Sequence, residues 1–491
     1  MLIRTGPGSN RLPTQAARSA LGRAARKTAP RTSLAIWAPA PDREDVVDQL
    51  AGQEVDRVPS LLPIRHSRMS VNPFTFYRGS ALTMATDLGT RPNSGLNVQL
   101  CGDAHLSNFG LFAAPDRAVI FDINDFDETL PGPFEFDVAR LTTSFTLAAQ
   151  NNGFSGVEIE NITLAAANSY RTAIAEFAKM GELEIWYNRV DASVLSGWGR
   201  DAAGAKGAQA AKRTIAKAQK RDTWSALSKL TEVVDGGRQF INAPPVLVRI
   251  SLESDVHPII GGLLEQYRGS LIDDRRELLS RFRLLDVGHK VVGVGSVGLL
   301  AFVILLQGRD ESDLLVLQVK QAVRSVLEPV TAPSEFDKQG ERVVSGQRLT
   351  QAASDIFLGW IRGKQGRDFY IRQLRDMKWS PDVTLLAPAY LRAYAMICGH
   401  TLARAHARSG DAIAIDSYLG TSAKFDNAML NFGLAYAEQV GKDFARYTDA
   451  IASGRVAVTR DEVVTANLAF AASAEHGIQA VRTPTAELAG G

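Results

Sequence analysis

Residues 101–109 read Cys101-Gly102-Asp103-Ala104-His105-Leu106-Ser107-Asn108-Phe109, directly after a short apolar run. A second stretch, residues 118–127, leads from apolar residues of strand character to Asp122, Asp125 and Asp127. We expect both stretches to form loops at strand ends, so that their carboxylate and amide groups lie close together. Oxygen ligands of this kind suit Mg²⁺, which proteins often share with substrate phosphates. The alternative is an acidic surface turn beside a buried histidine.

The composition is that of an ordinary globular protein, with 491 residues, 45% hydrophobic and 22% charged. Single cores stop growing near about 250–300 residues, so this length predicts two or three core-bearing lobes. The formal net charge of +2 gives no argument for nucleic acid or a membrane as partner. Two cysteines are too few for a disulfide framework, and the longest apolar run, residues 297–306, is too short to span a bilayer. We therefore expect a soluble, cytoplasmic protein.

The two ends of the chain are expected to lie outside the fold. Residues 1–41 contain seven basic residues and no acidic residue. A segment of this composition buries little surface, which predicts a disordered basic tail. It also resembles an organelle transit peptide. Residues 481–491 are expected to be frayed.

Helical periodicity follows the acidic stretches. Apolar residues recur every three or four positions over residues 141–151, 158–180 and 263–285. Between them, residues 206–221 carry six basic residues and no acid. This basic stripe is either a solvated helix face or a surface for an anionic substrate or nucleic acid. Further helices are predicted over residues 334–353, 387–408 and 426–451, and strands over residues 356–361 and 368–373.

A glycine-rich stretch marks a change of character after residue 284. Residues 291–298 read Val291-Val292-Gly293-Val294-Gly295-Ser296-Val297-Gly298 and predict a strand entering a loop. A return strand is predicted over residues 299–306, and a third strand, residues 314–320, ends at Lys320. In a dinucleotide-binding fold a helix would follow the glycines. Strands on both sides instead favour the nucleotide-clamping hairpin of protein kinases, with a lysine on the next strand.

Over almost its whole folded length the chain resembles a bacterial family of uncharacterised proteins, the domain of unknown function 2252. The resemblance rests on Asn72-Pro73-Phe74, Tyr77-Arg78-Gly79, residues 102–110, residues 124–128 and residues 355–360. It is specific, and it implies little about function.

Shorter motifs resemble those of aminoglycoside-phosphotransferase-like and choline-kinase-like enzymes. Such enzymes carry an H-G-D-x-H-x-x-N loop, then I-D-F-[DE], then an Asp in a Phe/Tyr-Asp-Leu-Ala context. The matching residues here are Gly102-Asp103, His105 and Asn108, then Asp125-Phe126-Asp127, then Phe136-Asp137-Val138-Ala139. Cys101 stands where those enzymes usually have His. The step of five residues from Asp103 to Asn108 equals that of the protein-kinase catalytic loop.

The second resemblance implies an α+β, protein kinase-like two-lobed fold with a small mixed β lobe and a large helical lobe. In a kinase the glycine loop and the lysine precede the catalytic loop, whereas here they follow it. The resemblance therefore implies a circularly permuted chain, which domains with neighbouring termini permit. Residues 42–285 and 377–480 would form the large lobe. Residues 286–376 would form the small nucleotide-binding lobe, with a hinge over residues 371–375.

By carry-over, Asp103, with His105 beside it, would accept the proton of the substrate hydroxyl, and Asp137 would brace the lobe. Asn108 would hold Mg²⁺ together with Asp125 or Asp122, because spacing does not decide between these two aspartates. ATP would be bound by the small lobe through Gly293, Gly295, Ser296, Gly298, Lys320 and Gln373.

Two further sets of residues were assigned from position along the chain. An acid of the helix after Lys320 should orient it, and Glu341 is preferred over Glu335 and Glu328. Arg78 and Arg68 are candidates for substrate or phosphate binding, since guanidinium groups bind such anions through a planar fork. Arg78 is equally a candidate structural partner for one of the aspartates.

The expected function is Mg²⁺-ATP-dependent phosphoryl transfer to a hydroxyl group of an unidentified small molecule. One alternative is a kinase-like regulator that binds nucleotide with little turnover, and another is an enzyme that transfers AMP. A third is a metallophosphoesterase, because residues 102–105 also read G-D-x-H. That chemistry needs two metals and several histidines, and no G-N-H-[DE] motif is present.

Overall fold

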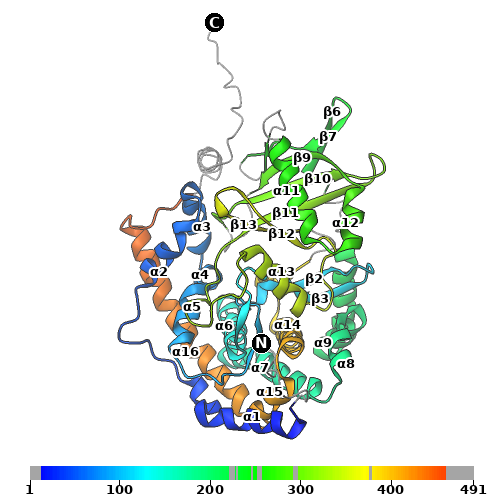
Figure 1. The fold of residues 1–491 in the computed structure, drawn as a ribbon. Coiled ribbons are helices and arrows are strands. Elements are labelled where there is room, and N and C mark those ends of the chain that lie inside the picture. The colour runs from blue at the N-terminus through cyan, green and yellow to red at the C-terminus, as the bar shows by residue number, and fades with distance from the viewer. Residues whose placement is uncertain are drawn as a thin grey trace.

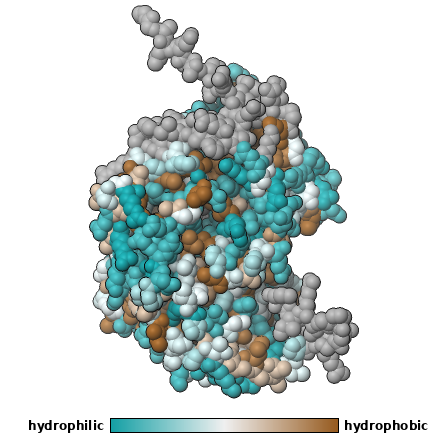
Figure 2. Space-filling model, turned by 60° about the vertical axis from the view of Figure 1, so that its left-hand side comes forward, coloured by the Kyte–Doolittle hydropathy of each residue, from teal (hydrophilic) through white to brown (hydrophobic). Residues whose placement is uncertain are grey.

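The computed structural model describes residues 13–219, 227, 230–244, 247–250, 257–290, 297–374 and 379–459. It is an α+β structure in which an antiparallel sheet lies at one end and most helices gather at the other (Figure 1). Hydrophilic residues predominate on the face shown in Figure 2, with hydrophobic residues scattered among them, as on most protein surfaces. None of the described helices combines the length and the apolar character needed to cross a bilayer.

The largest sheet has six strands in the order β12-β13-β11-β10-β9-β8, and all their pairings are antiparallel. Its strands are β8 Leu247–Ile250, β9 Arg283–Lys290, β10 Ala301–Gln307, β11 Leu314–Ala322, β12 Gly359–Arg362 and β13 Asp368–Gln373. β11 lies in the middle and is buried along almost its whole length. Because side chains alternate along a strand, Leu317 enters one hydrophobic cluster and Val316 enters another on the opposite face. Lys320 lies four residues after Val316, so its side chain is on the same face of β11 as Val316.

Helix α13, Gln339–Thr350, connects β11 to β12 and lies between the sheet and the helical part of the molecule (Figure 1). Two helices cover one face of the sheet, α11 His257–Ser270 and α12 Asp273–Ser280. Residues 247–250 and 257–282, which the sequence prediction assigned to the helical lobe, therefore belong to this sheet or pack with it. The helix predicted over residues 263–285 ends earlier, because β9 begins at Arg283. The predicted mixed β lobe is an antiparallel sheet.

The helical part is built around α6, Glu135–Asn151, of which almost every residue is buried. Around it pack α7 Gly156–Phe177, α14 Pro388–Ser409 and α16 Lys424–Ala452. Helices α7 and α14 approach closely at Gly399, where a Cβ atom would lie 2.4 Å from the carbonyl oxygen of Ala166. The three long helices predicted from periodicity over residues 158–180, 387–408 and 426–451 match α7, α14 and α16 within a few residues.

The remaining elements surround this core. The helices are α2 Val46–Gln53, α3 Leu62–Met69, α4 Pro73–Gly79, α5 Ala81–Gly89, α8 Glu182–Tyr187, α9 Ala192–Gln219 and α15 Ala412–Leu419. The strands are β1 Asn97–Leu100, β2 Phe109–Ala113, β3 Val119–Ile123, β4 Leu130–Pro133, β5 Val190–Asp191, β6 Thr231–Val234 and β7 Gly237–Phe240. β1 pairs with β4, and β2 pairs with β3.

The expectation of a disordered tail over residues 1–41 does not hold for residues 13–41. Helix α1, Gln15–Thr28, packs against α15. Arg26 Nε donates to the carbonyl oxygen of Tyr418 at 2.8 Å, and Arg31 donates to that of Leu419. The last carbonyl groups of a helix lack partners within it, so these arginines cap α15. Residues 1–12 and 481–491, the rest of the two predicted tails, lie outside the described residues.

Candidate active site

Asp137, at the start of α6, holds the loop that follows β1. Its carboxylate accepts hydrogen bonds from the main-chain nitrogens of Cys101 at 2.8 Å and Gly102 at 3.0 Å. Gly102 has φ +82°, and a Cβ atom there would lie 2.3 Å from the carbonyl oxygen of Glu128. Only glycine combines this conformation with this close approach. The loop therefore has one shape, fixed by Asp137 on one side and by the second acidic loop on the other.

Asp103 projects from this loop, and Arg140 fixes its position. Arg140 Nε donates to Oδ1 of Asp103 at 2.8 Å, and another guanidinium nitrogen of Arg140 donates to the carbonyl oxygen of Tyr77 at 2.7 Å. The amide nitrogen of Asn108 donates to the main-chain oxygen of Asp103 at 2.8 Å. His105 Nε2 lies 3.6 Å from Oδ2 of Asp103, too far for a strong hydrogen bond.

The second acidic loop follows β3 and meets Lys320 of β11. Lys320 Nζ donates to Oδ2 of Asp127 and lies 3.8 Å from Oδ1 of Asp125. Tyr370, which pairs with Lys320 across β13 and β11, donates its hydroxyl hydrogen to Oδ1 of Asp127 at 2.8 Å. Residues almost two hundred positions apart thus form one cluster, since Asp127 and Lys320 are separated by 193 positions.

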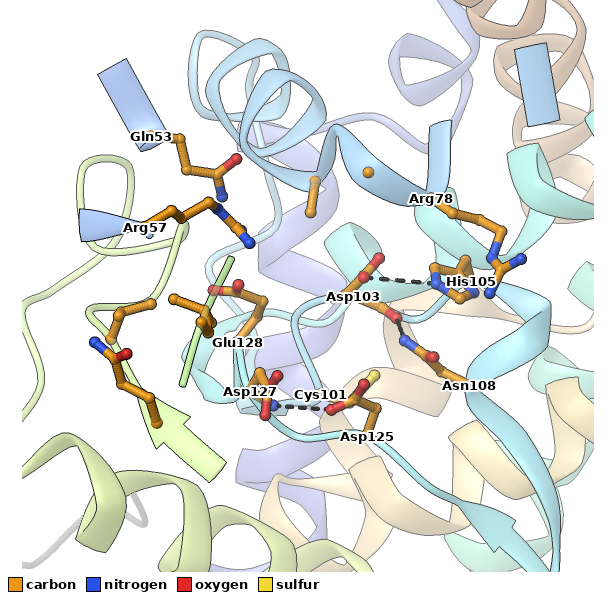
Figure 3. A pocket seen from close by; sticks show the side chains of 15 residues that line it. Gln53, Arg57, Arg78, Cys101, Asp103, His105, Asn108, Asp125, Asp127 and Glu128 are labelled. Carbon is orange, nitrogen blue, oxygen red and sulfur yellow. Dashed lines mark hydrogen bonds and ion pairs between the residues drawn. The ribbon is translucent and has the colours of Figure 1, made fainter. Parts of the chain in front are cut away.

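A cavity of about 140 Å³ joins the two loops. Figure 3 shows its lining side chains, with Asp103 between a group formed by His105 and Arg78 and a group formed by Glu128 and Arg57. The lining residues are Gln53, Arg57, Arg78, Gly79, Ala81, Cys101, Asp103, His105, Asn108, Asp125, Asp127, Glu128, Leu299, Gln321 and Val323. Four carboxylates and two arginines therefore face one small space.

Burial shifts several protonation equilibria in this cluster. It raises the pKa of Asp103, although the neighbouring Arg140 opposes the shift. It raises the pKa of Glu128 to about 7, against the opposing hydrogen bond from the Val326 nitrogen. Burial, with Arg78 and Arg140 nearby, lowers the pKa of His105, so its imidazole is neutral. Burial also disfavours the charged form of Lys320, but Asp125 and Asp127 outweigh it and raise the pKa of this lysine.

Five of the site residues predicted from the sequence line the cavity, and a sixth, Lys320, contacts it through Asp127. The five are Arg78, Asp103, His105, Asn108 and Asp125. Gly298, at φ +94°, packs against Arg57, whose guanidinium donates to the Val297 carbonyl at 2.6 Å. Gly293, Gly295 and Ser296 lie outside the described residues.

Asp122 is not among the residues that line the cavity, whereas Asp125 is. The Asp122 side chain is fully buried and accepts hydrogen bonds from Arg404 and from the main-chain nitrogen of Ala352. Its charge is thus neutralised by α14, away from the cavity. Arg68 on α3 and Gln373 on β13 are likewise not among the lining residues.

Glu341 is not the partner of Lys320, contrary to the sequence prediction, because the ion-pair partners of Lys320 in the described chain are Asp125 and Asp127. Helix α13 turns Arg342 inward instead. Arg342 donates to the carbonyl oxygens of Asp127, Thr129 and Val323 at 2.7–2.9 Å. Adjacent helical residues point about 100° apart, so an inward Arg342 directs Glu341 away. Glu328 pairs with Arg324.

Sequence reasoning missed several residues of the site. Arg140 had a usable signal, because it lies three residues after Asp137 on the same helix and directly follows the motif. It is the residue that donates to Asp103. Arg57 and Gln53 had none, because they come from a segment without a motif, and only the fold brings them to the cavity. Tyr370 and Arg342 act on Asp127 from the strand and the helix of the distant sheet region.

Fold and site together define an α+β protein in which two acidic loops of the helical part meet a lysine of an antiparallel sheet that follows them in the chain. The chain belongs to the bacterial family DUF2252: the family model, described as "Uncharacterized protein conserved in bacteria (DUF2252)", matches residues 57–450. This range contains Arg57 and all the other lining residues except Gln53. Comparisons with curated proteins and with solved structures found no match.

Proposed function

We propose that the protein is an ATP-dependent phosphotransferase with a circularly permuted, protein kinase-like fold, which phosphorylates a hydroxyl group of a small molecule. The observation that carries the proposal is the contact of Lys320 with Asp125 and Asp127 at the cavity that also contains Asp103 and Asn108. Kinases need this combination of a proton acceptor, oxygen ligands for Mg²⁺ and a strand lysine for the phosphates. The proposal is supported by the proximity of these residues, and a circular permutation would account for their order along the chain.

The strand topology supports the same proposal. In protein kinases the lysine lies on the third strand, after the two strands joined by the glycine-rich loop, and a helix follows it. Here β9 and β10 flank the glycine stretch, Lys320 lies on β11, and α13 follows. The departure is that Lys320 pairs with acids of the catalytic region rather than with an acid of α13. Nucleotide binding would therefore require Lys320 to exchange Asp127 for a phosphate oxygen.

The residues present fit a Mg²⁺ ion shared with phosphates. The nitrogen of the Asn108 side chain is engaged with the Asp103 carbonyl, which leaves its oxygen to act as a ligand. Asp125 supplies a carboxylate to the same cavity. One or two protein ligands of this type are what Mg²⁺ uses beside substrate phosphates. When bound, the ion would neutralise charge on the transferring phosphoryl group.

Asp103 is the residue that would take the proton. Arg140 occupies its Oδ1, so Oδ2 is available to the acceptor hydroxyl. In the proposed step the hydroxyl proton passes to Asp103, and the acceptor oxygen forms a bond to the terminal phosphorus of ATP. The bond from that phosphorus to its bridging oxygen breaks, and ADP leaves with the electron pair. A pKa raised by burial makes Asp103 a better proton acceptor than an exposed carboxylate.

Two alternatives use the same residues. Transfer of AMP would direct the acceptor oxygen to the α-phosphorus, and a regulator would bind nucleotide without turnover. The metallophosphoesterase alternative is less well supported, because His105 is the one histidine among the residues that line the cavity, whereas two-metal hydrolysis uses several.

The test is incubation of the full chain with ATP labelled at either the α- or the γ-phosphate, in the presence of Mg²⁺ and a metabolite extract. Label from the γ-position should appear in a new compound. Lys320→Met and Asp125→Asn should abolish this transfer, and Asp103→Asn should lower it by about 100- to 10 000-fold, the usual contribution of a general base. The exposed Lys424→Met is the matched control. Transfer of the α-label indicates AMP transfer, and full activity of the Lys320 and Asp125 variants would refute the assigned roles.

A further inference from the structure

Arg78 is a cation of the cavity wall that no described residue engages in an ion pair. It lies at the end of α4, which begins with a capping box at Asn72. Its Nε atom is buried without a hydrogen-bond partner, and no described residue forms a hydrogen bond or ion pair with its guanidinium group. Its aromatic neighbour Phe74 has its ring centroid 5.9 Å away. Arg78 is partly withdrawn from solvent, and desolvating a charge that has no hydrogen-bonded partner costs free energy.

The sequence also allowed Arg78 to be a structural partner of an aspartate. No described aspartate forms an ion pair with it. Asp103 is the acid next to Arg78, but Arg140 takes its Oδ1. Asp103 affects Arg78 only through space: burial lowers the pKa of Arg78, and the charge of Asp103 partly opposes that shift. Two arginines therefore flank one carboxylate, and Arg140 satisfies it.

His105 extends the same donor-rich region. His105 is 4% exposed, and its Nδ1 atom is also buried without a hydrogen-bond partner among the described residues. Figure 3 shows Arg78 and His105 next to each other, on the side of Asp103 away from Glu128 and Arg57. The acids Asp125 and Asp127 are engaged with Lys320. Beside Asp103 the cavity thus presents the Arg78 guanidinium and the His105 imidazole.

We propose that the acceptor is a compact anion, whose carboxylate or phosphate group is bound by Arg78 while its hydroxyl group faces Asp103. This proposal rests on the proposed function, since it names the substrate class of the same site. A guanidinium fork matches two oxygens of either anion. A cavity of about 140 Å³ has room for a group of a few non-hydrogen atoms next to the nucleotide phosphates. A cationic acceptor would instead meet Arg78 as a like charge.

The direct test is binding of inorganic phosphate and of acetate to the full chain, measured by calorimetry. Arg78→Met should weaken binding of at least one anion by about 10- to 100-fold, the usual effect of losing a charge-assisted hydrogen bond. Arg281→Met, at a side chain that is 70% exposed, is the control. Preference for phosphate or for acetate identifies which anionic group the acceptor carries. Anion binding that is unchanged in Arg78→Met overturns the proposal.

Thermal unfolding separates binding from a structural role. Without an anion, Arg78→Met should unfold at the same or a higher temperature, because no described residue loses a hydrogen bond or an ion pair with Arg78 and the substitution removes a mostly desolvated charge. A lower unfolding temperature would mean that Arg78 supports the fold, and would count against the proposal.

Binding of Mg²⁺-ATP to the wild-type chain, measured in parallel, tests the phosphotransferase proposal separately from the anionic-acceptor proposal. If ATP binds and Arg78 has no effect on anions, the acceptor proposal fails and the phosphotransferase proposal stands. If anions bind through Arg78 and ATP does not bind, the anion site stands and the phosphotransferase proposal fails.

Discussion

Arg404 of α14 and Asp122 of β3 form an ion pair whose side chains are 0% and 1% exposed. Two other nitrogens of Arg404 are buried without a hydrogen-bond partner, so Asp122 is the acid that compensates its charge. The pair joins the strand that leads into the second acidic loop to a central helix of the large helical part. It therefore positions the site from outside the cavity.

We predict that Asp122→Asn lowers the free energy of unfolding by about 3–5 kcal/mol, the usual cost of leaving a buried charge unpaired. Chemical denaturation measures this loss. Adding Arg404→Met to the Asp122→Asn variant should recover much of it, because both charges are then absent. If Asp122 were instead a metal ligand, Asp122→Asn would change the Mg²⁺ dependence of nucleotide binding and leave the apo stability nearly unchanged.

Glu341→Gln should leave ATP affinity within about twofold of the wild type, because Glu341 does not contact Lys320. Arg342→Met should destabilise the protein by about 3 kcal/mol or more, since three carbonyl groups around Asp127 lose their donor. ATP titration and denaturation of both variants provide the comparison. Loss of ATP binding in Glu341→Gln with an unchanged fold would support the sequence prediction that Glu341 orients Lys320.

Glu128 should make stability depend on pH. Its pKa is raised by burial from 4.5 to about 7 in the folded protein, so folding favours the protonated form. The stabilisation is complete below about pH 4.5 and is lost as the pH rises through 7. Denaturation curves between pH 5 and 8, with a chelator present, should show this decline. Glu128→Gln retains a hydrogen-bond acceptor for Val326 and should flatten it. An equal decline in both proteins would assign it to other groups.

Gly22→Ala tests the docking of α1. An added Cβ atom would lie 1.9 Å from the carbonyl oxygen of Ala414 on α15, so α1 would have to move. We expect a loss of roughly 1–3 kcal/mol, as for other overpacking substitutions, and a lower unfolding temperature. Gly441→Ala is the matched control: it lies within helix α16, nothing lies within 4 Å of an added Cβ, and alanine should stabilise the helix by about 0.5–1 kcal/mol.

The sequence predicted the long helices and the main residues of the cluster, because local signals carried them. Helical periodicity identified α7, α14 and α16. The density of acids and amides around Asp103 and Asp125 indicated a shared site, and strands on both sides of the glycines led to Lys320 on β11. That these residues meet depended on a resemblance rather than on any local pattern.

Two kinds of feature could not be predicted from the sequence: contacts between distant residues, and the rotation of a helix about its own axis. Asp122 and Asp125 are three residues apart, and the difference between them is set by Arg404, which lies 282 positions away. Whether Glu341 or Arg342 points inward depends on how α13 rotates against the sheet. The basic residues of α1 resembled a tail because their partners, the carbonyl groups at the end of α15, have no sequence signature.

The docking of α1 on α15 also has a consequence for how the protein is made. Arg26 and its acceptor Tyr418 are 392 positions apart, so a ribosome must synthesise all the intervening chain before α1 has α15 to pack against. Until then the nascent chain exposes the apolar side of α1, and long-range closure of this kind is slow. Docking of α1 should therefore be a late step of folding, and chains truncated before α15 should leave α1 without its packing surface.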